Sequence, residues 1–99
     1  MPFVTTQPEM LAAAAGNFQT IGSAMAANNS AAAGPTTGLI PAAADEVSAL
    51  TAMQFAMHAA MYQTISAEAA AIHQQFVVTL SASAASYAAT EAANSIAVG

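Results

Sequence analysis

Apolar and small residues recur with a helical period in the first third of the chain. One series of positions, seven residues apart, consists of Leu11, Phe18, Met25 and Ala32. A second series lies between them and consists of Ala14, Ile21 and Asn28. This spacing is that of a heptad seam, along which one helix packs against another. We therefore predict a helix over about residues 7–33.

The sequence also marks where this helix begins and ends. In Thr6-Gln7-Pro8-Glu9, Thr6 can accept a hydrogen bond from the N–H of Glu9, and Glu9 can reach back to the N–H of Thr6, which is a capping box. Pro8 is tolerated in the first turn because its missing N–H has no partner there. The segment GPTTGLIPAA, residues 34–43, holds two Gly and two Pro and predicts a turn.

A second and longer helix is predicted over about residues 44–83. Asp45 and Glu46 fall in its first turn, where their charge meets the positive end of the helix dipole. The sequence then runs without Gly or Pro through Ser83, which corresponds to roughly 55–60 Å of helix. Residues 84–99 hold few side chains able to build a core, so we predict a flexible C-terminal tail.

The large apolar residues of the second helix spread too widely for a single neighbour. On a helical projection they cover roughly 200°, whereas packing on one helix needs a stripe of about 100°. A two-helix hairpin would leave an exposed patch of the kind that marks an interaction site. We therefore predict an all-α, antiparallel hairpin that completes an elongated four-helix bundle with a partner chain. The predicted partner interface consists of Leu11, Phe18, Ile21, Met25, Leu50, Met53, Phe55, Met57, Met61, Tyr62, Ile65, Ile72 and Phe76.

Composition narrows the range of functions. The hydrophobic fraction is 57%, but much of it is alanine, which favours helix and buries little area. The chain has no Lys or Arg and a formal net charge of −5, which argues against binding of nucleic acid or anionic lipid. It has no Cys. No basic, apolar secretory leader and no run of about 18 apolar residues is present. Composition alone therefore favours a cytoplasmic protein, unless export uses another kind of signal.

We find no candidate catalytic, cofactor or metal site in the sequence. His58 and His73 are about 22 Å apart on a straight helix, too far to share a metal. No Ser lies in a G-x-S-x-G turn, and the glycines are too scattered for a phosphate loop. Glu68 stands among small residues, as expected for a solvated helix position. The methionines Met53, Met57 and Met61 suit either an adaptable binding surface or plain core filling.

Three segments together resemble the PE domain of mycobacterial PE/PPE proteins. They are the pair Pro8-Glu9, the stretch GLIPAAADEVSALTAMQFAMH and the run from Tyr87 to Glu91. The resemblance spans essentially residues 1–99 and implies a helical hairpin that pairs with a PPE protein. It further implies cytoplasmic assembly, an EspG-type chaperone contacting mainly the PPE subunit, and export of the folded pair to the cell surface or medium by a type VII (ESX) system. Many members continue beyond this domain, so the sequence to Gly99 fits a short member or the first domain of a longer one.

The resemblance also gives a role to the last aromatic residue. Tyr87 and Glu91 match the family's Y-x-x-x-D/E secretion motif, which is read together with a W-x-G turn on the partner. In a helix the two side chains lie together on one face. The alternative is that Tyr87 merely continues the apolar stripe, since it follows Leu80 by seven residues. The two roles are compatible.

Two other functions compete with that of a secreted, non-enzymatic heterodimer subunit. A homodimeric structural bundle, like the small W-x-G secreted proteins, is disfavoured because the chain has no Trp. A surface-active or ice-binding helix is disfavoured because the threonines show no regular 11-residue spacing. Solubility of the chain on its own would separate a homodimer from an orphan subunit.

Overall fold

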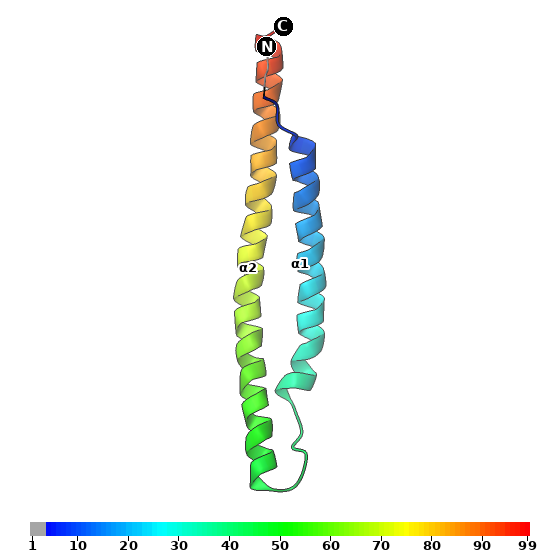
Figure 1. Cartoon of the computed structure of the whole chain (residues 1–99), viewed down its shortest axis with the longest axis vertical. Helices are drawn as coiled ribbons and strands as arrows, with labels where there is room; N and C mark the ends of the chain where they lie inside the picture. The colour runs from blue at the N-terminus through cyan, green and yellow to red at the C-terminus, as the bar shows by residue number, and fades with distance from the viewer. Residues whose placement is uncertain (1–3) are drawn as a thin grey trace. The chain divides into compact units, whose positions relative to one another are not determined.

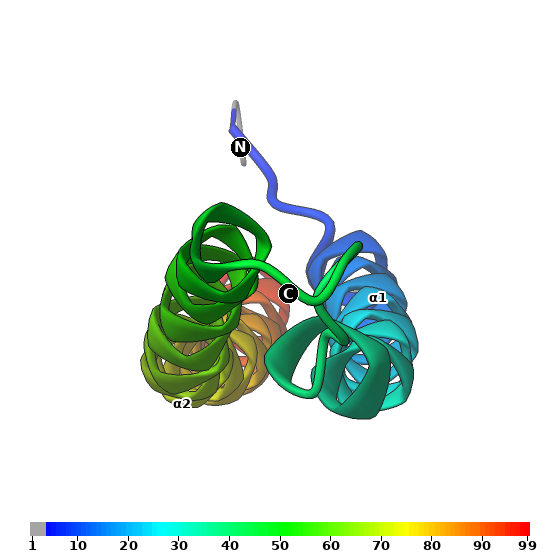
Figure 2. The same cartoon turned by 90° about the horizontal axis from the view of Figure 1, so that it is seen from below.

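Two α-helices make up nearly all of the described chain. The computed structural model describes residues 4–99, in which α1 runs over Pro8–Thr37 and α2 over Glu46–Ala97 (Figure 1). Residues 38–45 connect the end of α1 to the start of α2 (Figure 2). No residue from 4 to 99 lies in a β-strand. The predicted all-α hairpin is therefore confirmed, whereas the four-helix bundle with a second chain stays a prediction.

The contacts divide the chain into two compact units, each made of antiparallel helical segments. The first unit combines the chain up to Gly22 with His73–Gly99, so that it contains the start of α1 and the second half of α2. The second unit is Ser23–Ile72, a hairpin formed by the rest of α1, the connection and the first half of α2. We describe each unit by its own contacts.

Helix α1 continues four residues beyond its predicted end at residue 33. Pro35 lies in its last turn, where the helix is already ending and the cost of a proline is smaller than in the interior. The hydroxyl groups of Thr36 and Thr37 donate to the carbonyl oxygens of Ala32 and Ala33, each at 2.6 Å. These hydrogen bonds satisfy carbonyl oxygens at the end of the helix, which otherwise have no donor within it. The prediction from Gly and Pro residues alone did not include this contribution.

Helix α2 begins two residues after its predicted start at about residue 44, and it ends well beyond its predicted end at about residue 83. Asp45 precedes the helix as its N-cap, since its Oδ2 accepts from the N–H of Ser48 at 3.3 Å and its carbonyl accepts from the N–H of Ala49 at 3.1 Å. The helix continues to Ala97, so the segment predicted as a tail from residue 84 is helical through that residue. Alanine has the highest helix propensity, and the sequence contains no Gly or Pro between Pro41 and Gly99.

The most buried side chains are small. Ala15, Val77 and Ala84 in the first unit are at most 5% exposed, and Ala52 in the second unit is 6% exposed. On α1, the second series of seam positions is therefore at Ala15 and its seven-residue repeats, one position later than predicted. Those repeats are Gly22 and Asn29, both half-buried. Of the predicted positions, Ala14 is half-buried, while Ile21 and Asn28 are exposed.

In the second unit, α2 turns mostly small side chains, and not its large apolar ones, toward α1. In the second unit its buried and half-buried positions are Ser48, Ala52, Ala56, Ala59, Gln63 and Ser66. Small residues allow two helices to approach closely, because little side-chain volume separates them. The predicted apolar surplus is therefore larger than the sequence indicated, since the hairpin covers almost none of the large side chains of this segment.

Candidate functional site

The main candidate site is the outer apolar face of the second unit. We define this face by eight side chains of α2, each at least 51% exposed: Leu50, Met53, Phe55, Met57, Met61, Tyr62, Ile65 and Ile72. Met25 of α1, also in this unit, is 56% exposed. So much contiguous apolar surface is unusual on a protein that works alone. The three methionines belong to this exposed face, which excludes core filling within the hairpin itself.

A polar contact ties the edge of this face to α1. The hydroxyl of Tyr62 donates to Oδ1 of Asn29 at 2.7 Å, and Nε2 of Gln63 donates to the carbonyl oxygen of Asn29 at 2.9 Å. Asn29 thus receives hydrogen bonds from two successive residues of α2. These bonds fix the position of the Tyr62 ring relative to α1, so its apolar surface is presented in one orientation.

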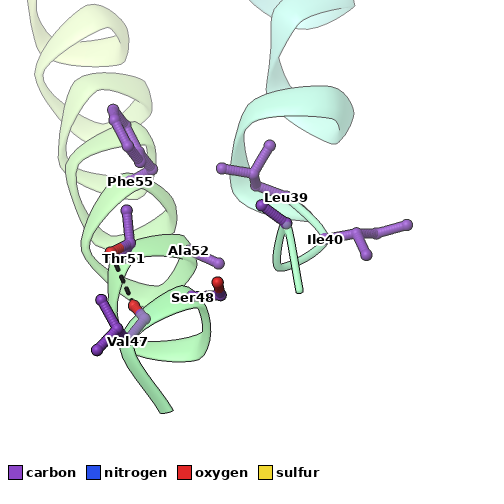
Figure 3. Close-up of a pocket in the computed structure, with 8 residues that line it drawn as sticks. Leu39, Ile40, Val47, Ser48, Thr51, Ala52 and Phe55 are labelled. Atoms are coloured by element: carbon purple, nitrogen blue, oxygen red, sulfur yellow. Dashed lines mark hydrogen bonds between the residues drawn. The ribbon is translucent and has the colours of Figure 1, made fainter. Parts of the chain in front are cut away.

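An apolar pocket lies where the connection meets the start of α2 (Figure 3). Its volume is about 300 Å³. In the close-up, Leu39 lies on the connection and Phe55 on the facing turn of α2, and both line the pocket. The pocket continues the outer apolar face through Phe55, and its lining is Leu39, Ile40, Ala42, Val47, Ser48, Thr51, Ala52 and Phe55.

In the first unit, Phe18, His73 and Phe76 meet in a second cluster beside Gly22. The rings of Phe18 and Phe76 lie edge to face, with their centroids 5.2 Å apart. The rings of Phe18 and His73 are also edge to face, with their centroids 6.1 Å apart. Nε2 of His73 is 2.6 Å from the carbonyl oxygen of Phe18, so the imidazole must carry its proton on Nε2 to donate there. A side chain on Gly22 would collide with this imidazole, because its Cβ would lie 2.8 Å from Cδ2 of His73.

The predicted motif glutamate makes a contact that the sequence did not suggest. Oε1 of Glu91 accepts a hydrogen bond from the backbone N–H of Thr6 at 2.8 Å and another from its hydroxyl at 3.0 Å. Figure 1 shows the segment before α1 passing beside the last turns of α2. Glu91 of α2 therefore receives the N–H that the predicted capping box assigned to Glu9. Tyr87, one turn earlier, is 46% exposed.

The other residues considered for chemistry lie on the surface. Glu9, His58 and Glu68 are exposed, and Pro8 is the half-buried first residue of α1. Within residues 4–99, no three His, Cys, Asp or Glu side chains are grouped so that they could hold a metal ion. None of the helices described is both long enough and apolar enough to cross a membrane.

Sequence reasoning missed Gly22, Asn29 and Gln63 as contact residues, and it assigned Thr6 to Glu9 instead of Glu91. A signal existed for two of them, since Gly22 and Asn29 follow Ala15 at seven-residue intervals. For Thr6 no local signal existed, because its partner is 85 positions away. The structure brings together Phe18 with Phe76, both predicted interface residues, and leaves Leu11 half-buried. The other predicted interface side chains are exposed.

Comparison with known proteins gives a consistent family of relatives. A model of the PE family matches residues 4–94. The chain is 67% identical over 97 residues to PE family protein PE13 of Mycobacterium tuberculosis, covering 98% of each chain. It is 56% identical over 95 residues to PE8 of the same species, covering 96% of this chain and 34% of PE8. Identity to PE-PGRS family protein PE_PGRS33 is 55% over 94 residues, which is 20% of that protein.

Proposed function

This chain belongs to the PE family, and from that premise we propose that it is the non-enzymatic PE subunit of a PE/PPE heterodimer exported by a type VII (ESX) secretion system. The single observation that supports pairing most strongly is the distribution of side chains on α2. Small residues occupy the contact with α1, and the large apolar residues of the second unit are exposed. A second helical pair seated on these residues would complete a four-helix bundle.

The size of the exposed face supports the proposed pairing on energetic grounds. Burying one side chain the size of Leu, Phe or Met contributes about 1.5–3 kcal/mol. Eight such side chains form the outer apolar face. The contact between α1 and α2 offers far less, since it is built mostly from Ala, Gly and Ser. In this proposal the PPE partner provides most of the apolar burial, and an EspG-type chaperone contacts mainly that partner before export.

The proposed export signal is the pair Tyr87 and Glu91. The two residues lie at i and i+4 on α2, so their side chains are neighbours on one helical face. Tyr87 is largely exposed and the carboxylate of Glu91 is held in place by Thr6. A component of the secretion machinery would therefore read an ordered pair on a helix. The protein would assemble in the cytoplasm and act at the cell surface or outside the cell.

Affinity purification of the tagged chain from a mycobacterial host tests the pairing. We expect one PPE protein to co-purify in equimolar amount. Recovery of a homodimer without another subunit would contradict the proposal and would favour the structural homodimer.

Export is tested on Tyr87→Ala and Glu91→Ala in the same host. Each variant should still co-purify with its partner, yet it should accumulate in the cells and be depleted from the culture filtrate. Normal export of both variants would show that this pair is not the signal. Reduced recovery of the complex with Tyr87→Ala would instead assign Tyr87 to packing.

A further inference from the structure

The contact between Thr6 and Glu91 joins the segment before α1 to the last turns of α2. Both donors of Thr6, its N–H and its hydroxyl, bind the same carboxylate oxygen at 2.8 and 3.0 Å. Thr6 and Glu91 are each half-buried, whereas Thr5 next to Thr6 is exposed. Hydrogen bonds to an ionised acceptor are roughly twice as strong as neutral ones. The contact is therefore specific in geometry and is strong for a surface position.

This contact restricts the glutamate in a way that the helix alone does not. A free glutamate on a helix surface samples several rotamers, and ordering it costs conformational entropy. With Oε1 held by Thr6, the carboxylate has one orientation, and Oε2 takes no part in the two hydrogen bonds. The charge also lies beside the N-terminal end of α1, where the helix dipole favours an anion.

We propose that Thr6 is a positioning residue for the Tyr87–Glu91 pair, so that the surface recognised by the export machinery is assembled from both ends of the chain. This inference rests on the proposed function of the pair. Thr6 orients the Glu91 carboxylate, and the recognising component binds it through Oε2 together with the exposed ring of Tyr87. The entropic cost of fixing the Glu91 side chain then falls on folding, so it does not weaken binding by the recognising component.

The test uses the complex of the chain with its co-purified partner and three substitutions. Thr6→Val removes the hydroxyl and keeps the side-chain shape, Thr6→Ser keeps a hydroxyl, and Thr5→Val makes the same change at the exposed neighbour. Amide hydrogen exchange at residue 6 reports the contact, and the amount in culture filtrate reports export. We expect Thr6→Val to speed the exchange about tenfold and to lower export severalfold. Thr6→Ser and Thr5→Val should resemble the unchanged protein.

Each contrary result has a distinct meaning. Normal export of Thr6→Val despite faster exchange would overturn the positioning role. Unchanged exchange would show that the contact does not hold Thr6, and increased export would show that it obstructs recognition. Loss of the partner from Thr6→Val would place Thr6 in assembly and would also overturn the inference. If Tyr87→Ala and Glu91→Ala are themselves exported normally, the proposed signal fails, whatever Thr6 does.

Discussion

Gly22 has no side chain, and this allows the His73 imidazole to pack against α1. The His73 imidazole occupies the space beside it and reaches the carbonyl oxygen of Phe18. Gly16, also in α1, has open space where its Cβ would lie. The two glycines therefore offer a matched pair, in which the same substitution gains the same helix propensity but meets different surroundings.

Replacing each glycine by alanine should give different changes in stability. Gly16→Ala should raise the free energy of unfolding of the complex by about 0.5–1 kcal/mol, because glycine is a poor helix former. Gly22→Ala should be less stable than Gly16→Ala by about 1–3 kcal/mol, the usual cost of overpacking. Thermal unfolding of the purified complexes measures both.

A double variant checks that the cause is the imidazole. With His73→Ala in place, Gly22→Ala should become as favourable as Gly16→Ala, since the obstructing ring is gone. If Gly22→Ala is already stabilising in the unchanged background, the close approach of His73 to Gly22 is wrong.

The stability that Asp45 contributes as the N-cap of α2 depends on pH. The pKa of its carboxyl lies below the ordinary value of 3.8 because Ser48 donates to it, from its side chain first and also from its backbone N–H. A lowered pKa in the folded state means that the cap contributes stability above the unfolded value and loses it as the pH falls through the folded value. The contribution is therefore full at neutral pH.

Asp45→Ala should reduce the stability of the complex at neutral pH and should cease to do so in acid. We expect the difference from the unchanged protein to shrink between about pH 5 and pH 2. Denaturation by urea across this range measures it. Ser48→Ala removes one donor and should weaken the same dependence. A difference between Asp45→Ala and the unchanged protein that stays constant with pH would contradict a role for the ionised cap.

At the scale of the element, α2 has two faces with different tasks. In the second unit its small residues pack within the chain, and its large apolar residues are exposed. This division explains why the apolar periodicity of the sequence was misleading. Apolar periodicity normally indicates the face that packs within the same chain. Here it indicates the face turned away from α1, and the alanines that form the internal contact give no distinctive pattern.

A charge on the outer apolar face should prevent pairing. Phe55 is 60% exposed on this face, and burial of one such ring contributes about 1.5–3 kcal/mol. Phe55→Asp loses that contribution and places an unpaired carboxylate in the contact, which costs several kcal/mol more if the contact excludes water. Co-purification of the partner should therefore fall sharply.

The matched control for this substitution is Ala67→Asp. It adds the same charge at an exposed position of α2 that a helical projection places outside the outer apolar face. Recovery of the complex with Ala67→Asp should be close to normal. If the Phe55→Asp complex is recovered in full, Phe55 lies outside the interface with the partner.

The extent to which the sequence predicted the fold differs from feature to feature. The two helices could be predicted because their periodicity and the Gly and Pro residues between them are local signals. The end of α2 could not, since an alanine-rich segment remains helical without contributing to a core. The contact between Thr6 and Glu91 could not either, because no local pattern relates residues 85 positions apart. Tyr87 and Glu91 were found only through resemblance to a family motif.

For the molecule as a whole, we expect the isolated chain to be unstable. Its buried side chains are few and small, and such contacts leave little to offset the conformational entropy lost on folding. Expressed alone, the chain should aggregate or unfold without a cooperative transition. Co-expression with the PPE partner should give a soluble complex that unfolds cooperatively, as followed by circular dichroism. A monodisperse monomer with a sharp thermal transition would contradict this expectation.

The hydrogen bonds between Thr6 and Glu91 have a practical consequence for labelling this protein. A fluorescent or affinity tag fused ahead of residue 4 would be attached next to the carboxylate proposed for export. Such a fusion could block export while leaving the helices intact, and the failure would be misattributed to the size of the cargo. A short epitope inserted between Ala43 and Ala44, in the exposed connection, belongs to the other unit and avoids this contact, the pocket lining and the Asp45 cap. Reporters for this chain should therefore be compared at both positions before any export defect is assigned to a substitution.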